Sequence, residues 1–376
     1  MIRISSNFDS GNIIVAKADA PDAIELEIRK DAGEDHYQWF HFRVTGARDQ
    51  ALTMRISNAG GASYPKGWEG YRACASYDRQ SWFRVDTDYA DGALAIRHTP
   101  ERDSVWYAYF APYSMERHHN LVARCLQSRR CALEPLGATV DGQEMDLLRI
   151  GEPGEGKRAM WVIARQHPGE SMAEWWMEGF LDRLLDPVDR AAKALLDAAV
   201  LWVVPNMNPD GSRRGHLRNN AAGVNLNRAW EEPSPETSPE VFLVRQKMQE
   251  TGLDFCLDVH GDEAIANNFI AGAEGIPAWS DRLADLKARY LQGLLDASAD
   301  FQTGEGYPVS PPGKANLKMA TSWIGQHFDA LSMTLEMPFK DANVNPEPAH
   351  GWSPERCMDF GRANLSVMAE LAGALR

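Results

Sequence analysis

Two His–x–x–Glu arrangements contain the residues of this sequence that are best suited to bind a metal ion. The first is formed by His167 and Glu170, and the second by His260 and Glu263. Two imidazoles and one carboxylate, with a fourth position left for water, make up the usual catalytic zinc site. Taken alone, either arrangement is also typical of a solvated polar turn.

The predicted elements before these motifs bring the two histidines together. His167 comes shortly after the apolar run 159–164, and His260 follows the apolar run 255–259 directly. Parallel strands of an α/β sheet end at one edge, where such sheets bind their ligands. This placement favours one zinc site made by His167, Glu170 and His260 over two unrelated turns.

Two further groups have chemistry that complements a metal site. Arg218 and Arg228 lie ten residues apart in the asparagine-rich loop 218–228. Such a loop is either simply solvated or supplies a forked site for a carboxylate. Glu336 stands last in the predicted strand 332–336, where burial raises the pKa of a carboxyl group and suits it to general base catalysis.

These motifs together resemble the zinc carboxypeptidases, and within them the cytosolic carboxypeptidase subfamily. The resemblance covers nearly the whole chain, with the motifs in the family's order and spacing. The motifs are HPGE (167–170), NPDG (208–211), GVNLNRAW (223–230), DVH (258–260) and TLE (334–336), together with QWF (38–40) and YAYF (107–110) near the N-terminus.

The resemblance implies that the protein is a zinc metallocarboxypeptidase, a hydrolase that removes residues from peptide or protein C-termini. It implies zinc binding by His167, Glu170 and His260, water activation by Glu336, oxyanion stabilisation by Arg218, and recognition of the terminal carboxylate by Asn227 and Arg228.

Two positions depart from the pattern of many relatives. Asn225 stands where many relatives have an aspartate that orients the first zinc histidine, and its amide can still accept a hydrogen bond from His167. Tyr307 is our candidate for the tyrosine that carboxypeptidases outside this subfamily place on a mobile loop. The alternative for Tyr307 is an ordinary aromatic residue in a Gly/Pro-rich loop.

The periodicity predicts two domains of different class. Residues 1–115 alternate apolar and polar positions in short runs, which predicts an antiparallel β-sandwich. Residues 116–376 combine buried strands with long helices, which predicts an α/β domain, and the family resemblance implies a mixed central sheet flanked by helices. The predicted elements are strands 24–28, 39–44, 52–56, 82–85, 94–97, 105–110, 159–164, 200–204, 255–259 and 332–336, and helices 173–185, 239–250, 279–297 and 354–375.

The amino-acid composition limits the kinds of partner that the protein can bind. The net charge of −14 argues against a nucleic acid partner. The longest runs without a charged residue have twelve residues, too few to span a membrane. No secretory signal is recognisable, and five scattered cysteines fit a reducing cytoplasm. The oligomeric state is not predicted.

Two alternative functions remain at this point. One is a zinc amidohydrolase of the aspartoacylase and succinylglutamate desuccinylase type, although those chains lack a preceding β domain. The other is a non-catalytic binding protein, which the retention of all three ligands and Glu336 argues against. The sequence also leaves open whether the residue removed is glutamate, which would require a cation in the pocket. Candidates for that cation are Arg213, Lys314 and Lys318.

Several other conspicuous residues are interpreted as structural. The pair His118 and His119 is expected to be solvated at the domain junction. Trp175, Trp176 and Phe180 have the spacing of a buried helix face. Cys256, inside the strand before His260, is expected to be a buried thiol.

Overall fold

The N-terminal part of the chain forms a β-sandwich in the computed structural model, which describes residues 2–375. One sheet has the strand order β1-β4-β10-β6-β7 and is antiparallel throughout. The other has the order β2-β3-β5-β9-β8, with β3 and β5 as a parallel pair. The strands are β1 Arg3–Ser5, β2 Ile14–Lys17, β3 Ile24–Glu27, β4 His41–Thr45, β5 Leu52–Ile56, β6 Cys74–Ser76, β7 Phe83–Arg84, β8 Asp86–Ala90, β9 Ala93–His98 and β10 Ser104–Ala108.

The sandwich core follows from the alternation of apolar and polar residues. In β3, Ile24 and Leu26 are buried, whereas Glu27 is exposed. Leu26 from one sheet and Phe42 and Tyr107 from the other belong to the same hydrophobic cluster. Burial of one face of each sheet against the other is therefore the main stabilising contribution in this part of the chain.

The rest of the chain is built around a seven-stranded mixed sheet with the order β11-β12-β14-β13-β15-β17-β16. The central strands β14, β13, β15 and β17 are parallel to one another, and the strands at the two margins pair antiparallel. The strands are β11 Cys131–Ala138, β12 Glu144–Ile150, β13 Arg158–Ala164, β14 Ala199–Val204, β15 Phe255–Asp262, β16 Phe269–Ala271 and β17 Leu331–Pro338.

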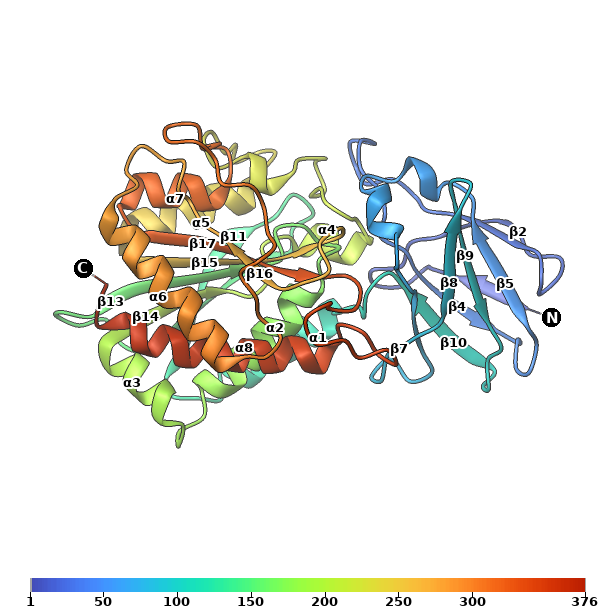
Figure 1. The fold of residues 1–376 in the computed structure, drawn as a ribbon, viewed down its shortest axis with the longest axis horizontal. Coiled ribbons are helices and arrows are strands. Elements are labelled where there is room, and N and C mark those ends of the chain that lie inside the picture. Colours follow the sequence, from blue (N-terminus) through green and yellow to red (C-terminus); the bar gives the residue numbers. More distant parts are fainter. Residues whose placement is uncertain (1, 376) are drawn as a thin grey trace.

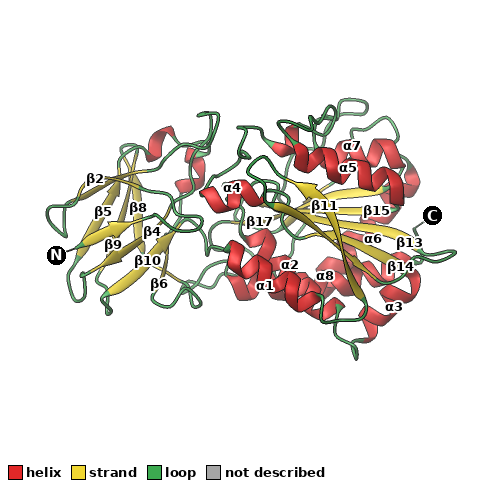
Figure 2. Cartoon of the chain, turned by 180° about the vertical axis from the view of Figure 1, so that it is seen from behind, coloured by secondary structure: helices red, strands yellow, loops and turns green. Residues whose placement is uncertain are grey.

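Helices cover both faces of this sheet (Figure 2). In β13, Met160 and Val162 join the core under α2, α3, α6 and α8, whereas Trp161 and Ile163 join the core under α5 and α7. The helices are α1 Met115–Cys125, α2 Met172–Leu184, α3 Arg190–Ala198, α4 Pro209–Arg214, α5 Pro239–Thr251, α6 Asp281–Ala297, α7 Ala320–Phe328 and α8 Pro354–Ala372.

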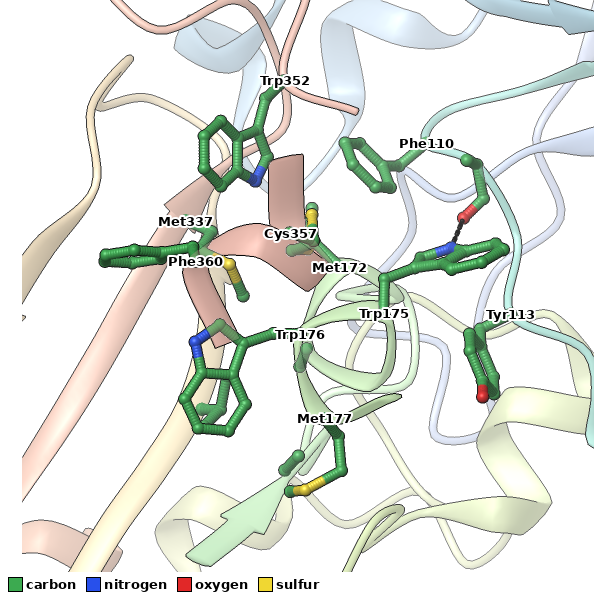
Figure 3. Close-up of a cluster of buried hydrophobic side chains, with 14 of the residues drawn as sticks. Phe110, Tyr113, Met172, Trp175, Trp176, Met177, Met337, Trp352, Cys357 and Phe360 are labelled. Carbon is green, nitrogen blue, oxygen red and sulfur yellow. Dashed lines mark hydrogen bonds between the residues drawn. The ribbon is translucent and has the colours of Figure 1, made fainter. Parts of the chain in front are cut away.

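Helices α2 and α8 pack unusually closely at glycines. A Cβ atom at Gly179 would lie 2.1 Å from the carbonyl oxygen of Met358, and one at Gly361 would lie 2.1 Å from that of Trp176. Figure 3 shows the aromatic and sulfur-containing side chains that fill the space around this crossing. Trp175, Trp176 and Phe180 are buried there, as expected from their spacing.

The predicted fold class is confirmed. The predicted central strands and the long helices are present, with ends displaced by a few residues. The helices predicted to start at residues 239 and 354 begin at Pro239 and Pro354, and the Ser353 side chain accepts the backbone N–H of Arg356. Within residues 2–375, no helix is long and apolar enough to cross a bilayer.

Candidate active site

The carboxyl ends of the parallel strands point toward the sandwich (Figure 1). His260 and Glu336 are direct partners in the β15–β17 ladder, so their side chains lie on the same face of the sheet. His167 comes three residues after the end of β13, and Glu170 lies just before the start of α2. The sheet edge therefore collects residues that are up to 169 positions apart in the sequence.

His167, Glu170 and His260 form a buried cluster. The Oε1 atom of Glu170 lies 2.7 Å from Nδ1 of His167, and its Oε2 atom lies 2.8 Å from Nδ1 of His260. The two Nδ1 atoms are 3.2 Å apart. In the described residues this is the only group of three or more His, Cys, Asp or Glu side chains whose ligand atoms lie within 4.8 Å of one another. Glu263 lies outside the group.

The hydrogen bonds of the two Nε2 atoms determine which nitrogen of each ring carries the proton. They therefore determine whether the Nδ1 atoms have free lone pairs. Nε2 of His167 lies 3.1 Å from Oδ1 of Asn225, and Nε2 of His260 lies 2.9 Å from Oδ2 of Asp258. If both Nε2 atoms donate to these oxygens, both Nδ1 lone pairs face the Glu170 carboxylate. Two lone pairs at 3.2 Å cannot hydrogen-bond to each other. A cation between them satisfies both, so the donor set fits zinc.

Arg165 supports the loop that carries His167 and Glu170. This fully buried residue has φ +60 and donates from Nε to the Pro168 carbonyl at 2.9 Å. Its Nη1 atom donates to Oε2 of Glu174 at 2.6 Å. Gly169 lies against Leu217, because a Cβ there would approach the Leu217 carbonyl oxygen to 2.9 Å.

His118 belongs to this support and is not solvated, so the interpretation of His118 was wrong. Its ring is buried, with Nδ1 2.7 Å from Oε1 of Glu174 and Nε2 3.2 Å from Oδ2 of Asp146. Burial alone would lower the pKa of His118, but the two carboxylates raise it to about 9. The burial of His118 was missed because no helix was predicted over residues 115–125. His119 is exposed.

Glu336 is buried at the site but is not bonded like a structural carboxylate. Its Oε1 atom lies 3.2 Å from the Tyr307 hydroxyl, and its Oε2 atom has no hydrogen-bond partner among the described residues. Burial raises the pKa of Glu336 well above its usual range, and Glu170 raises it further, while positive charge at His260 lowers it. A cation held by the neighbouring cluster would lower this pKa again.

Tyr307 reaches the site from the loop before α7. Its hydroxyl donates to Oδ2 of Asp262 at 2.6 Å, and its ring packs edge-on against Phe269 with centroids 4.9 Å apart. Burial and the nearby carboxylates of Glu336 and Asp262 raise the pKa of Tyr307, so the phenol keeps its proton. Asp262 was not predicted as a site residue.

Arg218 and Arg228 lie near each other beside the cluster. Burial lowers the pKa of Arg228, and the charge of Arg218 lowers it further. The charge of Arg218 also lowers the pKa of His167, after burial. Within the described chain, neither guanidinium has a carboxylate within 4.0 Å. Asn227 is buried, and its Oδ1 accepts the backbone N–H of Ala320 at 2.9 Å, which leaves its amide N–H groups available.

A cavity of about 550 Å³ opens beside these residues. Asn227, Tyr307 and Glu336 line it together, and its wall includes the buried pair Thr321 and Thr334, whose hydroxyls are 2.6 Å apart. A volume of this size accommodates a single side chain with room for water.

The cation in this cavity is not one of those considered from the sequence. Lys287 lines the wall and is paired with Glu274. Arg213, Lys314 and Lys318 are exposed, and none of the three is among the described residues that line the cavity. Lys287 lies on α6, far from any motif, and no local pattern in the sequence distinguishes it from a surface lysine.

Comparison with known proteins identifies the family. Residues 4–110 match the model of the cytosolic carboxypeptidase N-terminal domain, and residues 122–351 match the zinc carboxypeptidase model. The chain belongs to the zinc carboxypeptidase family. The family match shows that the chain is a zinc-dependent metallocarboxypeptidase, as the motifs predicted. Enzymes of this kind are hydrolases, and their metal is zinc. The match thus favours a carboxypeptidase over the amidohydrolase and over a non-catalytic protein.

Several carboxypeptidases resemble the chain over its full length. A metallo-carboxypeptidase from Pseudomonas aeruginosa, solved in complex with (2-guanidinoethylmercapto)succinic acid, is 47% identical with a TM-score of 0.96 and full coverage of both chains. A metallo-carboxypeptidase from Burkholderia cenocepacia is 44% identical with a TM-score of 0.97, covering 99% of this chain and 100% of that one.

The mammalian relatives are more distant and longer. Mouse cytosolic carboxypeptidase 6 is 28% identical over 300 residues, which cover 70% of this chain and 54% of the mouse protein. The chain therefore spans about half the length of that relative.

Proposed function

We propose that this carboxypeptidase hydrolyses the last peptide bond of peptides or proteins that have a free C-terminal carboxylate. One observation carries the proposal. Arg218 and Arg228 lie close enough that the charge of Arg218 lowers the pKa of Arg228, yet neither is paired with a carboxylate of the described chain. Arg218 is half-buried and Arg228 is exposed, so both guanidinium groups are open to a ligand that supplies the anions.

The substrate of a carboxypeptidase supplies two such anions. The terminal carboxylate is present in the ground state, and the oxyanion forms at the scissile carbonyl in the transition state. We assign Arg228, with the free amide of Asn227, to the carboxylate, because Asn227 lines the cavity beyond Glu336. We assign Arg218 to the oxyanion, because its charge acts on His167 in the ligand cluster.

His167, Glu170 and His260 would hold the zinc ion, which supplies a Lewis acid that polarises the carbonyl and acidifies water. Glu336 takes a proton from the attacking water as the new C–O bond forms. The C–N bond then breaks, and Glu336 passes the proton to the leaving amine. Its unpartnered Oε2 supports this role, since that oxygen is available to a water molecule. Tyr307 covers the base on the side of the cavity.

Amidation of the substrate tests the proposal most directly. A peptide amide replaces two charged oxygens with one neutral acceptor, so the carboxypeptidase should cleave the free-acid peptide and leave the amidated one intact. Arg228→Ala should raise KM for the free-acid peptide with a smaller effect on kcat, because this contact is made before and during the reaction. Arg213→Ala removes an exposed arginine outside the cavity and serves as the matched control. Equal cleavage of both peptides would overturn the proposal.

The glutamyl hypothesis needs a separate measurement. Among the described residues that line the cavity, Lys287 is the one lysine or arginine, and it is paired with Glu274. Preference for a C-terminal glutamate would therefore require Lys287 to leave Glu274 for the substrate. Peptides that differ only in a final Glu, Lys, Arg or Leu should reveal the preference, and Lys287→Met should abolish it if glutamate is favoured.

We further propose that the two domains meet near residue 115, at the start of α1, and that the protein acts in the cytoplasm. The five cysteines are all unpaired, and four of them are buried, which fits a reducing compartment.

A further inference from the structure

The loop that carries Arg218 lies against the sandwich, not against the catalytic sheet alone. The Nδ2 atom of Asn12 donates to the Gly215 carbonyl at 2.8 Å, and Arg29 donates to the Arg214 carbonyl at 2.9 Å. These contacts fix the start of the loop from residues of the N-terminal sandwich part that lie outside its strands.

A close approach between two glycines fixes the other end of this loop. Gly33 has φ +87, and a Cβ there would lie 3.1 Å from the Gly223 carbonyl oxygen. Gly223 has φ +79, and a Cβ there would lie 2.9 Å from the Gly33 Cα. Both positions require glycine on account of the backbone angle and of the contact. The segment between residues 215 and 223 is thus held by the sandwich at both ends.

Asp31 of the sandwich binds the middle of the segment through three consecutive backbone N–H groups. Leu217 donates to Oδ1 at 2.7 Å, Arg218 to Oδ2 at 2.7 Å, and Asn219 to Oδ2 at 3.0 Å. The Asp31 residue is only 2% exposed. Hydrogen bonds from backbone amides to a buried carboxylate are short and strong, and three in succession fix the backbone on both sides of the Arg218 Cα.

The sandwich also positions the other end of the Arg218 side chain. The Tyr64 ring lies under the guanidinium, with the Cζ atom 5.4 Å from the ring centroid. Tyr64 is fixed in turn, because its backbone N–H donates to Oε1 of Gln38 at 2.8 Å. An aromatic face stabilises a guanidinium without neutralising its charge, so Arg218 stays available to an anion.

We propose that Asp31 is a positioning residue for Arg218, and that the sandwich is thereby a working part of the carboxypeptidase active site. The inference rests on the proposed function insofar as Arg218 stabilises the oxyanion. In the described chain, the hydrogen bonds of the Asp31 carboxylate go to the backbone of residues 217–219 and not to His167, Glu170 or His260. It fixes the backbone from which Arg218 reaches the reacting carbonyl.

Replacement of Asp31 should affect turnover more than binding. In Asp31→Asn one carboxylate oxygen becomes an amide group that faces a backbone donor, so the loop loses at least one bond. We expect kcat to fall about 10- to 100-fold, the range typical of a misplaced catalytic group. KM for a free-acid peptide should change less than about threefold, since Asn227 and Arg228 are untouched. Zinc content should stay at the wild-type level.

Asp35→Asn is the matched control. Asp35 accepts from the side-chain Nδ2 of Asn219 at 2.6 Å, so the control removes the same charge from the same interface without touching the backbone of Arg218. Its kcat should remain within about twofold of wild type. Asp31→Glu, which keeps the carboxylate but displaces it, should recover part of the lost activity and replaces Asp31→Asn if that variant does not fold.

A double-mutant cycle separates positioning from a merely structural role. If Asp31 acts through Arg218, Asp31→Asn should have no further effect on kcat in an Arg218→Ala background. The same fold-loss with and without Arg218 would overturn the proposal.

Backbone hydrogen exchange gives a readout that does not depend on activity. Exchange in residues 217–219 should be faster in Asp31→Asn than in Asp35→Asn or wild type. Unchanged exchange would overturn the positioning role, even in active protein. The wild-type protein could also cleave no peptide while residues 217–219 still exchange faster in Asp31→Asn than in wild type. That result would overturn the proposed function alone.

Discussion

The hydroxyl of Tyr307 lies 3.2 Å from Oε1 of Glu336, although 29 residues separate them in the sequence. The same hydroxyl donates to Asp262 at 2.6 Å. A phenol has one proton, so the shorter contact uses it, and the contact with Glu336 becomes a hydrogen bond when Glu336 itself is protonated. Asp262 and Tyr307 are thus arranged to stabilise Glu336 after it has accepted a proton.

Tyr307→Phe tests this arrangement. The ring and its contact with Phe269 are kept, and only the hydroxyl is lost. We expect kcat to fall about 10-fold, which corresponds to the loss of one hydrogen bond of about 1.4 kcal/mol, while zinc content stays the same. Steady-state kinetics on a free-acid peptide measure the effect. Tyr89→Phe removes a hydroxyl outside the site and is the control; an equal loss in both variants would argue against a role for Tyr307 at Glu336.

Glu336→Gln should separate base catalysis from binding. The amide has nearly the same shape but cannot accept a proton from water at neutral pH, so turnover should fall at least ~100-fold. Zinc content and the affinity for a non-cleaved peptide should remain, because Glu336 comes from β17 and lies outside the cluster of His167, Glu170 and His260. Calorimetric titration and single-turnover assays give the two values. Retained turnover would exclude Glu336 as the base.

The metal site can be tested without any substrate. Purified wild-type protein should contain about one zinc ion per chain, and His167→Ala or His260→Ala should lose it. Glu170→Gln and Glu263→Gln form a matched pair, because both carboxylates are buried and belong to similar motifs. Only Glu170 contacts both histidines, so only Glu170→Gln should weaken zinc binding. Elemental analysis after dialysis provides the measurement, and the opposite pattern would show that the wrong carboxylate was assigned.

Sequence periodicity predicted the central strands of the seven-stranded sheet well and its marginal strands poorly. The strands β13, β14, β15 and β17 are almost entirely buried and rich in apolar residues, and their N-terminal ends could be predicted within one position. Strand β11 could not, because its residues alternate between intermediate and exposed and include Pro135. Marginal strands lack the hydrophobic pattern on which such predictions depend.

The candidate site likewise contains residues that the sequence could predict and residues that it could not. His167, His260 and Glu336 lie at or near the carboxyl ends of strands that converge at one sheet edge, so their proximity could be inferred from the order of the elements. Asp258 could also have been found, since it lies two residues before His260 and thus on the same side of β15. Asp31 and Tyr64 could not, because only the packing of the sandwich against the loop of residues 215–223 brings them to Arg218.

His118 gives the carboxypeptidase a proton-linked stability. Glu174 and Asp146 face the ring, and Arg165 faces Glu174. The folded-state pKa of about 9 exceeds the ordinary value of 6.5, so the folded protein holds the proton more tightly than the unfolded chain does. The resulting stabilisation is fully present below pH 6.5 and is lost as the pH rises through about 9. A difference of this size corresponds to about 3 kcal/mol.

The His118→Gln variant should therefore lose most stability at low pH. The difference in unfolding free energy between wild type and this variant should be largest near pH 6 and should shrink by about 3 kcal/mol by pH 10, measured by urea denaturation. His119→Gln alters the exposed neighbour and should show no such pH dependence. Comparison with wild type at each pH removes the contribution of other titrating groups, which both proteins share. A constant difference across this range would mean that folding does not raise the pKa of His118, and the carboxylates of Glu174 and Asp146 would then not stabilise a charged ring.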